Sequence, residues 1–428
     1  MSHGDWKDMF LGVQNNDLEL VQFYIKMGID INYQHPEFMT SPLIESISCR
    51  HPQMTAMLLQ NGASPTIHEA GSNKSPLKIA RELKNIEAIK ILNQYLESGQ
   101  QNISDSTLAS LSRKPTMKAA ICTKYGGPEV LKIQEIVKPL PKSNEILVKI
   151  IATAVNSGDV RVRGLAVEGF MKIIMRLVLG ISKPRKPVLG TVYAGIVESI
   201  GPSVSKFEVG DKVFGMTGFN FGTYAEYVAV NEKSNATLMP GNITFEEAVS
   251  LIFGGQTAIY FLEKAKIREK LNPTILIIGA TGSVGTAAVQ LAKFFGAEVT
   301  AVCSSAGLML MKTLGVTNII LYDKDDFTQT TKKFDIIFDA VGKTTKSQCE
   351  KLLAKDGIYK TVGGLEYASE SQQQLELIKE LSEKGEYKAV IDKTFSLDNV
   401  VEAHQYVDTG RKKGNVILKI SDDTSLNY

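Results

Sequence analysis

Residues 274–296 read TILIIGATGSVGTAAVQLAKFFG, and this stretch decides the fold of the second half of the chain. An apolar run typical of a buried strand ends at a glycine-rich turn, and a helical pattern follows at once. Because a parallel sheet binds ligands at the carboxyl ends of its strands, this turn predicts a cradle for the pyrophosphate of a dinucleotide.

The three glycines of the turn have different expected tasks. Gly279 makes the turn, Gly282 lets the backbone approach the phosphates, and Gly285 allows the helix to pack closely on the strand. Ser283 and Val284 then lie at the helix N-terminus, where backbone amides would hold phosphate. The spacing is GxxGxxG rather than GxGxxG, so a tight turn without a ligand remains the alternative interpretation.

The sequence around this turn alternates between apolar runs and helical segments, which is typical of a parallel sheet with covering helices. We therefore predict an α/β Rossmann dinucleotide-binding domain over residues 241–394. The expected strands lie at 275–279, 298–303, 318–321, 334–341 and 357–363.

The choice of dinucleotide is read at the end of the second expected strand, VTAVCSSAG. It carries no acid that would bond the ribose 2′-hydroxyl of NAD. Ser304 and Ser305 could donate hydrogen bonds to a 2′-phosphate, and Lys312 could add positive charge. The sequence therefore favours NADP(H) as the cofactor.

The segment before residue 241 has a different sequence pattern. From Met117 onwards, short alternating runs separated by Pro and Gly indicate strands and loops. We predict a mostly β catalytic domain over 117–240, completed by about 395–428. Residues 98–116 are rich in Ser, Thr and Gln and are expected to be a linker.

The first hundred residues repeat on themselves. The tripeptide SPL at 41–43 recurs at 75–77. A turn glycine stands at residue 28 and again at residue 62, so both features repeat at an offset of 34 residues. Each SPL places proline early in an expected helix, where its missing amide costs nothing. The pattern resembles the ankyrin repeat, with about three α-helical units in 1–97. The resemblance implies a surface for an unknown protein partner; a purely structural appendage is the alternative.

Charge and composition exclude several function classes. Forty-eight basic residues against 46 acidic ones leave a net charge of +2, which gives no electrostatic footprint for nucleic acid. Apolar stretches are short or interrupted, so membrane insertion is not expected. The four cysteines lack metal-binding spacing. Acids stand where a signal peptide would need a basic start, so a cytoplasmic location is expected.

From Met117 to about Ile420 the chain resembles the zinc-free branch of the medium-chain dehydrogenase/reductase superfamily, the quinone and enone reductases related to zeta-crystallin. The segments that carry this resemblance include MKAAICTKYGGPEVLKI, AVNSGDVRVRG, VLGTVYAGIVESIG, FGGQTAIYFL, GATGSVGTAAVQLAKFFGAEV and FDIIFDAVGK. The resemblance implies a split GroES-like catalytic domain packed on the Rossmann domain, an active site in the cleft between them, and NADPH as hydride donor.

No zinc ligands are expected. Zinc-dependent relatives place a cysteine where this chain has NSGD at 156–159, and a His-Glu pair where it has GTVY at 190–193. Without a Lewis acid to hold an alkoxide, reduction of a quinone or an α,β-unsaturated carbonyl is favoured over oxidation of an alcohol.

The resemblance also implies catalytic residues. Asn156 matches the asparagine that lines the nicotinamide side of the cleft, and Asp159 and Arg161 follow in the same loop. Tyr193 lies with Thr191 in the strand that faces substrate. The alternatives are that Asn156 satisfies loop amides, that Asp159 and Arg161 pair with each other, and that Tyr193 belongs to the core.

The remaining expected cofactor contacts come from the same resemblance. Thr257 matches the threonine beneath the nicotinamide, and Tyr322 matches the tyrosine near adenine. Val341, Gly342, Val362 and Gly363 end the strands that pass the nicotinamide ribose. From the tail, Arg411 and Lys413 either approach phosphate or form a solvated basic turn.

One departure from the family lies after residue 364, where only the short polar stretch LEYASESQ precedes the next helix. Related proteins carry a further strand there, through which two subunits pair. We therefore expect a sheet of five strands, one short of the usual six, and a homodimer is possible but in doubt. The expected function is an NADPH-dependent, zinc-free quinone or enone reductase with an ankyrin module. The alternative is a catalytically impaired dinucleotide-binding scaffold that acts through its repeats.

Overall fold

The computed structural model describes residues 3–97, 115–165, 175–364 and 366–422. These residues belong to two compact units, Met1–Pro115 and Thr116–Tyr428. In the described ranges, no helix combines the length and the apolar character that a bilayer crossing requires.

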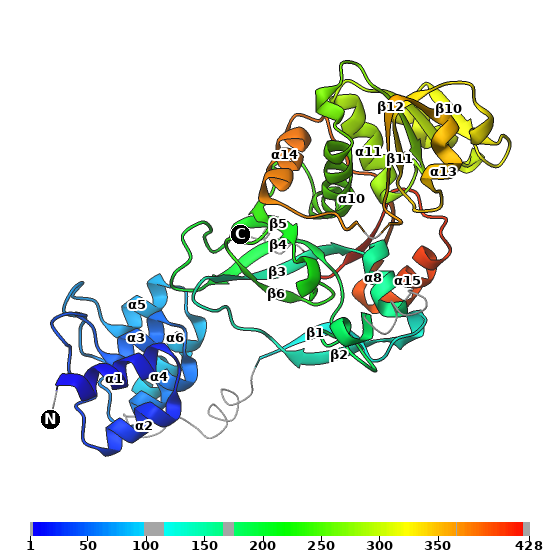
Figure 1. The fold of residues 1–428 in the computed structure, drawn as a ribbon. Coiled ribbons are helices and arrows are strands. Elements are labelled where there is room, and N and C mark those ends of the chain that lie inside the picture. Colours follow the sequence, from blue (N-terminus) through cyan, green and yellow to red (C-terminus); the bar gives the residue numbers. More distant parts are fainter. Residues whose placement is uncertain (1–2, 98–114, 166–174, 365, 423–428) are drawn as a thin grey trace. The chain divides into compact units, whose positions relative to one another are not determined.

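Within residues 3–97, the first unit contains three pairs of helices (Figure 1). The repeated Ser-Pro-Leu segments begin equivalent helices, because Ser41 and Ser75 each accept a hydrogen bond from the amide three residues later. The pairs are α1 (His3–Gln14) with α2 (Leu18–Lys26), α3 (Pro42–Ser48) with α4 (Pro52–Gln60), and α5 (Pro76–Glu82) with α6 (Ile86–Glu97).

Side-chain amides join successive pairs in this unit. Asn32 accepts a hydrogen bond from the Ser64 amide at 2.8 Å, and Gln34 donates to the His68 carbonyl at 2.7 Å. The three pairs share one hydrophobic core. They therefore form a continuous stack, as expected from repeats that cannot bury their apolar faces alone.

The second unit begins with a mostly β region. Its main sheet has the order β13-β14-β3-β4-β5-β7, and β6 also pairs with β3. The strands of this sheet are β3 (Glu145–Ala154), β4 (Val192–Ile200), β5 (Lys212–Met216), β6 (Tyr227–Asn231), β7 (Ala236–Leu238), β13 (Ile391–Ser396) and β14 (Asn415–Lys419). A separate two-stranded sheet is made of β1 (Thr116–Cys122) and β2 (Leu131–Val137).

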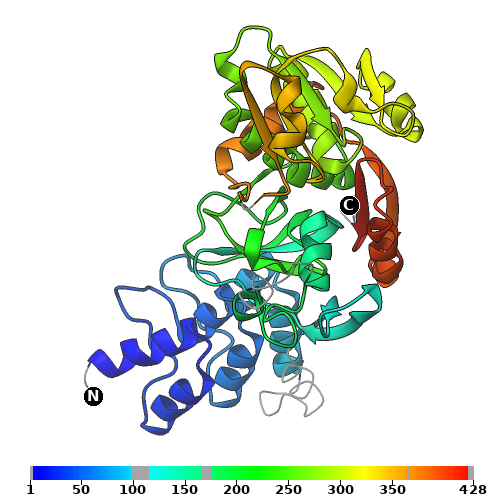
Figure 2. The ribbon, with the colours of Figure 1, turned by 45° about the vertical axis from the view of Figure 1, so that its right-hand side comes forward.

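Helices α8 (Ser157–Gly164) and α15 (Val400–Asp408) also belong to the β region. Figure 2 shows the C-terminal segment, in red, returning to the β region. This return begins with β13 at Ile391, slightly earlier than the expected residue 395.

The other part of the second unit is a parallel sheet with the order β10-β9-β8-β11-β12. The chain moves outward from β8 through β9 to β10, then crosses to the other side of β8 for β11 and β12. Such a reversal creates a crevice at the carboxyl ends of the two central strands. The strands are β8 (Thr274–Ile278), β9 (Glu298–Cys303), β10 (Asn318–Leu321), β11 (Phe334–Asp339) and β12 (Leu353–Thr361).

Helices cover both faces of this sheet (Figure 1). Ile275 and Ile277 of β8 belong to the largest core, which includes residues of α10 (Phe245–Lys264), α11 (Ser283–Phe294) and α14 (Gln372–Glu383). Leu276 and Ile278 belong to a second core that includes Cys349 of α13 (Lys346–Cys349). The continuous apolar run TILII is therefore buried on both sides, as a parallel strand requires.

The sheet ends at β12. Residues 366–371, which are described between β12 and α14, contain no strand, in agreement with the five strands expected from the sequence. A further helix, α12 (Leu308–Thr313), follows the 3₁₀ turn η4 (Ser305–Gly307) after β9.

Candidate functional site

The glycine loop follows β8 at the crevice. Gly279 has a φ of +74°, and a Cβ atom added at Gly285 would lie 2.2 Å from the Gly279 carbonyl oxygen. Both positions therefore require glycine for the turn and for close helix packing. A Cβ at Gly282 would instead meet no described atom closer than the Gly279 carbonyl oxygen at 3.8 Å. Gly282 thus borders free space at the helix N-terminus, where a phosphate group fits.

The first turn of α11 is joined to the C-terminal segment. Buried Ser283 donates a hydrogen bond to the Gly414 carbonyl at 2.9 Å, and the Gly414 amide donates to the Thr281 carbonyl at 2.7 Å. Val284 and Gly285 are buried in the same turn. The β region and the parallel sheet therefore meet directly at the glycine loop.

Lys412 of the C-terminal segment lies beside the glycine loop, and the sequence interpretation missed it. Its Nζ contacts the Ser283 hydroxyl, and it donates to the Gly414 carbonyl at 2.9 Å. Burial lowers the pKa of Lys412 to about 8, and Asp392 acts in the opposite direction. A cation at the positive end of a helix dipole is a favourable partner for an anion placed between them.

The two tail residues that the sequence proposed for phosphate lie on either side of Lys412. Arg411 is exposed, and the Lys413 amide donates to Asp392 at 2.8 Å. The basic run RKKG was the available signal, but its spacing alone does not say which side chain faces the glycine loop.

The ends of β9 and β10 lie side by side. The Tyr322 amide donates to the Cys303 carbonyl at 3.0 Å, while Tyr322 as a whole is 58% exposed. Ser304 and Ser305 follow β9 and are half-buried, but Lys312 is exposed in the last turn of α12. The Ser305 amide donates to Asp323, a carboxylate that was not assigned from the sequence.

The ends of β11 and β12 complete the crevice. A Cβ at Gly279 would lie 2.5 Å from Val341, so these two loops touch. Gly342 has a φ of +73° and packs against Gly363 so closely that a Cβ would lie 2.6 Å from the Gly363 Cα. The Val362 amide donates to the carbonyl of residue 339 at 3.1 Å. Four expected cofactor residues are thus brought together.

Asp339 fixes the loop after β11, and it too was missed from the sequence. Its buried carboxylate accepts hydrogen bonds from the amides of Val341 at 3.1 Å, Gly342 at 2.9 Å and Thr344 at 2.7 Å. The sequence feature that could have identified Asp339 is its place as an acid at the end of the apolar run FDIIFD. Its role is to hold the backbone that borders the crevice.

Thr257 lies on α10, one turn after Gly254. A Cβ at Gly254 would lie 2.4 Å from the Ser283 carbonyl oxygen, so α10 packs directly against the first turn of α11. Thr257 is half-buried. Thr257 thus lies one helical turn beyond the contact between the two helices, and its place beneath the nicotinamide stays a prediction.

Asn156 is the β-region residue best placed to meet a ligand. It is buried between β3 and α8, and its Nδ2 donates to the Thr191 hydroxyl at 3.4 Å. In the part of the chain that the structure describes, its buried Oδ1 has no hydrogen-bond partner. An orphaned buried acceptor is costly, so this atom fits a ligand donor. The preceding amide of Val155 donates to the Val416 carbonyl at 2.8 Å, next to the segment that reaches the glycine loop.

Asp159 holds the Asn156 loop. It is fully buried and accepts hydrogen bonds from the amides of Asn156 at 2.9 Å and Gly190 at 3.2 Å. Burial raises the pKa of Asp159 to about 7, and these amides oppose that rise. Arg161 is exposed on the same helix. These contacts make Asp159 a positioning residue for Asn156.

Tyr193 does not sit with these residues. It is fully buried in the core that Ile146 and Val213 share, which is the alternative that the sequence left open. Successive side chains of β4 alternate between faces, and Val192 and Ala194 belong to the core shared with α10. Tyr193 therefore points to the opposite face of the sheet.

Buried Arg163 joins α8 to α15 through two side-chain contacts. Arg163 Nη1 lies 3.0 Å from His404 Nδ1, and Arg163 Nη2 lies 2.7 Å from Asp408 Oδ2. Burial, assisted by the Arg163 cation, lowers the pKa of His404 to about 3. Since α8 follows Asn156 and α15 precedes Lys412, these contacts fix the supports of both residues.

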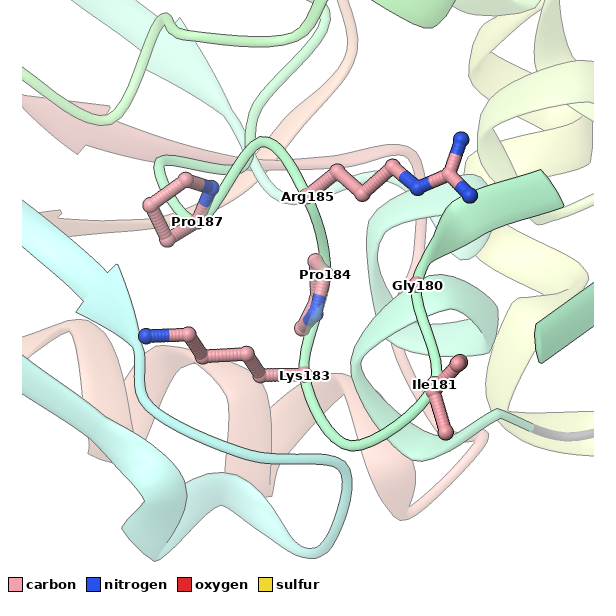
Figure 3. A pocket seen from close by; sticks show the side chains of 6 residues that line it. All are labelled: Gly180, Ile181, Lys183, Pro184, Arg185 and Pro187. Atoms are coloured by element: carbon pink, nitrogen blue, oxygen red, sulfur yellow. The ribbon is translucent and has the colours of Figure 1, made fainter. Parts of the chain in front are cut away.

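A separate cavity of about 370 Å³ lies in the β region, and none of the expected site residues lines it. Figure 3 shows its basic side chains, Lys183 and Arg185, on one loop. Its other lining residues are Gly180, Ile181, Pro184 and Pro187.

Metal ligands do not gather at this site. Within residues 3–97, 115–165, 175–364 and 366–422, no group of three or more His, Cys, Asp or Glu side chains could hold a metal ion. The backbone amides, the Lys412 cation and the Asn156 amide group at the crevice suit phosphate and carbonyl oxygen.

Comparisons with known proteins agree with this architecture. Residues 142–241 match the model of the alcohol dehydrogenase GroES-like domain, and residues 283–400 match the model described as zinc-binding dehydrogenase. The 2-methylene-furan-3-one reductase of Solanum lycopersicum is 34% identical, over 77% of this chain and 85% of its own. The chloroplastic NADPH-dependent alkenal/one oxidoreductase of Arabidopsis thaliana is 30% identical, over 77% and 86%. The solved quinone oxidoreductase from Coxiella burnetii superposes with a TM-score of 0.65 at 26% identity, over 72% of this chain and 100% of its own.

Proposed function

The chain belongs to the medium-chain dehydrogenase/reductase superfamily, and from this premise we propose that it transfers hydride from a reduced nicotinamide dinucleotide to a quinone or an α,β-unsaturated carbonyl, without zinc. NADPH is the first candidate donor, because the Arabidopsis relative is named for it and the end of β9 itself carries no acid. The names of the relatives support the acceptor class.

The observation that carries this proposal is the free space at Gly282, closed on one side by the C-terminal segment. A dinucleotide bound there has its pyrophosphate at the first turn of α11. Residues of both the parallel sheet and the β region then surround it, which is what a hydride transfer between two bound molecules requires.

The proposed roles of the residues follow from their contacts. The amides at the start of α11 and the Lys412 cation hold phosphate, while the Asp339 loop forms the wall beside it. Asn156 Oδ1 accepts a hydrogen bond from a ligand hydroxyl or amide, and Asp159 keeps that loop in place. The dinucleotide supplies the hydride.

An activated acceptor suits this set of groups. Reduction of an enone or quinone develops negative charge on oxygen, which needs hydrogen-bond donors and a proton rather than a metal. Asn156 Nδ2 is a neutral donor on the β-region side of the crevice. Oxidation of an unactivated alcohol would leave an alkoxide with no Lewis acid to stabilise it.

A second candidate function rests on a different observation. The described residues between β12 and α14 contain no strand, so the parallel sheet ends at five strands rather than the six expected for the family. A protein that binds dinucleotide without turnover, and acts through helix pairs that resemble ankyrin repeats, would tolerate that loss. We assign the helix pairs a protein-binding role in either case, with the partner unknown.

The proposal is tested by calorimetric titration of the full chain with NADPH and NADH, followed by a turnover assay with a panel of quinones and enones. Tight binding and oxidation of the dinucleotide by at least one acceptor are expected. Binding without turnover on every acceptor would favour the second candidate, and binding of neither dinucleotide would contradict both.

A further inference from the structure

An acid reaches the ribose-binding end of the site from an unexpected strand. In dinucleotide-binding folds, a carboxylate at the end of the second strand accepts a hydrogen bond from the 2′-hydroxyl of NAD and repels the 2′-phosphate of NADP. Here β9, the second strand, ends at Cys303 and is followed by two serines. The neighbouring strand β10 is parallel, with Leu321 beside Cys303, so the residues after both strands emerge together.

Asp323 occupies the hydrogen-bond donors of Ser305. The Ser305 amide lies 2.8 Å from Oδ1 and 3.1 Å from Oδ2, and the Ser305 hydroxyl lies 3.1 Å from Oδ1. The amide of Tyr322 donates a hydrogen bond to the Cys303 carbonyl, which holds the loop after β10 beside the loop after β9. Desolvation alone would raise the pKa of Asp323, but the Ser305 donors, with the Asp323 amide and the Lys324 cation, together hold the pKa below its ordinary value.

The negatively charged Asp323 carboxylate therefore accepts hydrogen bonds from Ser305, whose donors the sequence assigned to a 2′-phosphate. Asp323 is exposed and therefore accessible to a ligand. Lys312, the cation expected to offset a phosphate, is exposed in the last turn of α12 rather than in the turn that holds Ser305. A hydroxyl donor suits this carboxylate, whereas a phosphate must displace it.

Resting on the proposed function, we propose that Asp323 is a specificity-determining residue, which disfavours the 2′-phosphate and lets NADH serve as hydride donor beside NADPH. The chemistry that recognises the cofactor at this point is a carboxylate that accepts a hydrogen bond from a ribose hydroxyl.

Asp323 also stabilises the turn η4 through the Ser305 amide. A purely capping role would alter stability, and both affinities equally, without changing the preference between the two dinucleotides. The ratio of the two dissociation constants therefore separates the two roles.

The test is titration calorimetry of NADPH and NADH on the full chain, for the wild type and Asp323→Asn. Asp325→Asn is the matched control, because Asp325 is an exposed carboxylate of the same turn. Loss of the charge should shift the ratio of dissociation constants about tenfold towards NADPH, a change of roughly 1.4 kcal/mol. The control should leave the ratio unchanged.

Asp323→Ser retains an acceptor for the Ser305 amide and gives a second measurement of the ratio if the asparagine variant unfolds. Binding of both dinucleotides with the same ratio in the wild type and the folded variant would overturn the inference alone. Binding of neither dinucleotide by the wild type would instead contradict the proposed function, and with it this inference.

Discussion

Lys412 and Asn156 show how single side chains give the crevice its chemistry. One places a cation at the N-terminus of α11, and the other places a buried acceptor beside the segment that reaches it. Neither residue belongs to the parallel sheet that carries the glycine loop. The site therefore depends on the return of the chain to the β region after α14.

We predict that Lys412→Met weakens the binding of NADPH and NADH by a similar factor of about tenfold, because the lost charge faces a phosphate common to both. The effect should shrink at high salt, since screening weakens the attraction in the wild type. Titration calorimetry at two salt concentrations measures it, with Lys413→Met as the control. Equal effects of the two variants would show that Lys412 has no special position.

His404 should make stability depend on pH. The unfolded chain takes up a proton at this histidine near pH 6.5, but the native chain does so only near pH 3. The free energy of unfolding should therefore decrease as the pH falls through this interval. His404→Gln retains an acceptor for Arg163 and does not titrate, so its stability should fall less steeply between roughly pH 7 and pH 5.

Urea denaturation at several pH values measures this difference. Asp159, whose pKa is raised to about 7, has the opposite effect, because its contribution to the free energy of unfolding is lost as the pH rises. It is present in both proteins, so the difference between them isolates His404. Identical slopes would mean that His404 accepts a proton in the native state at its ordinary pKa.

At the scale of elements, the glycine loop separates structural from functional glycines. A Cβ at Gly285 would overlap the Gly279 carbonyl, whereas a Cβ at Gly282 would enter free space. We predict that Gly282→Ala folds with nearly wild-type stability but loses most of its affinity for dinucleotides. Gly285→Ala should instead lower the thermal midpoint by several degrees, at about 1–3 kcal/mol for overpacking.

Thermal unfolding and titration calorimetry on the same two samples check this pair. A Gly282→Ala protein that binds dinucleotide as tightly as the wild type would show that phosphate does not approach this glycine. The pair also distinguishes a cradle from a tight turn without a ligand, the alternative that the sequence left open.

Local patterns predicted the elements of the parallel sheet well. The run TILII, the glycine turn and the following helix lie where the sequence placed them, because their signals are local. The five expected strands are present, and the first and second occupy 274–278 and 298–303. The SPL segments likewise begin equivalent helices.

The sequence predicted the site less completely, because its missing members come from other elements. Asp323 was not assigned, since it reaches Ser305 only through the parallel pairing of β10 with β9. Lys412 could not be distinguished from Arg411 and Lys413 without knowing where Gly414 meets Thr281. Tyr193 was assigned to the substrate side because resemblance gives a position along β4 but not the face that points to α10.

At the scale of the whole molecule, the chain divides into two compact units with separate hydrophobic cores. We predict that removal of residues 1–115 leaves dinucleotide affinity unchanged within about twofold, because every residue of the crevice lies beyond Thr116. Titration calorimetry on the shortened chain tests this. A large loss of affinity in a folded product would show that the helix pairs contribute to the site.

The central claim is that this crevice transfers hydride. It is tested most directly by the oxidation rate of NADPH and NADH with a panel of enones and quinones, comparing the wild type with Gly282→Ala. We predict turnover by the wild type with at least one acceptor, and its loss in the folded Gly282→Ala variant. Tight binding of a dinucleotide by the wild type with no oxidation by any acceptor would contradict the claim.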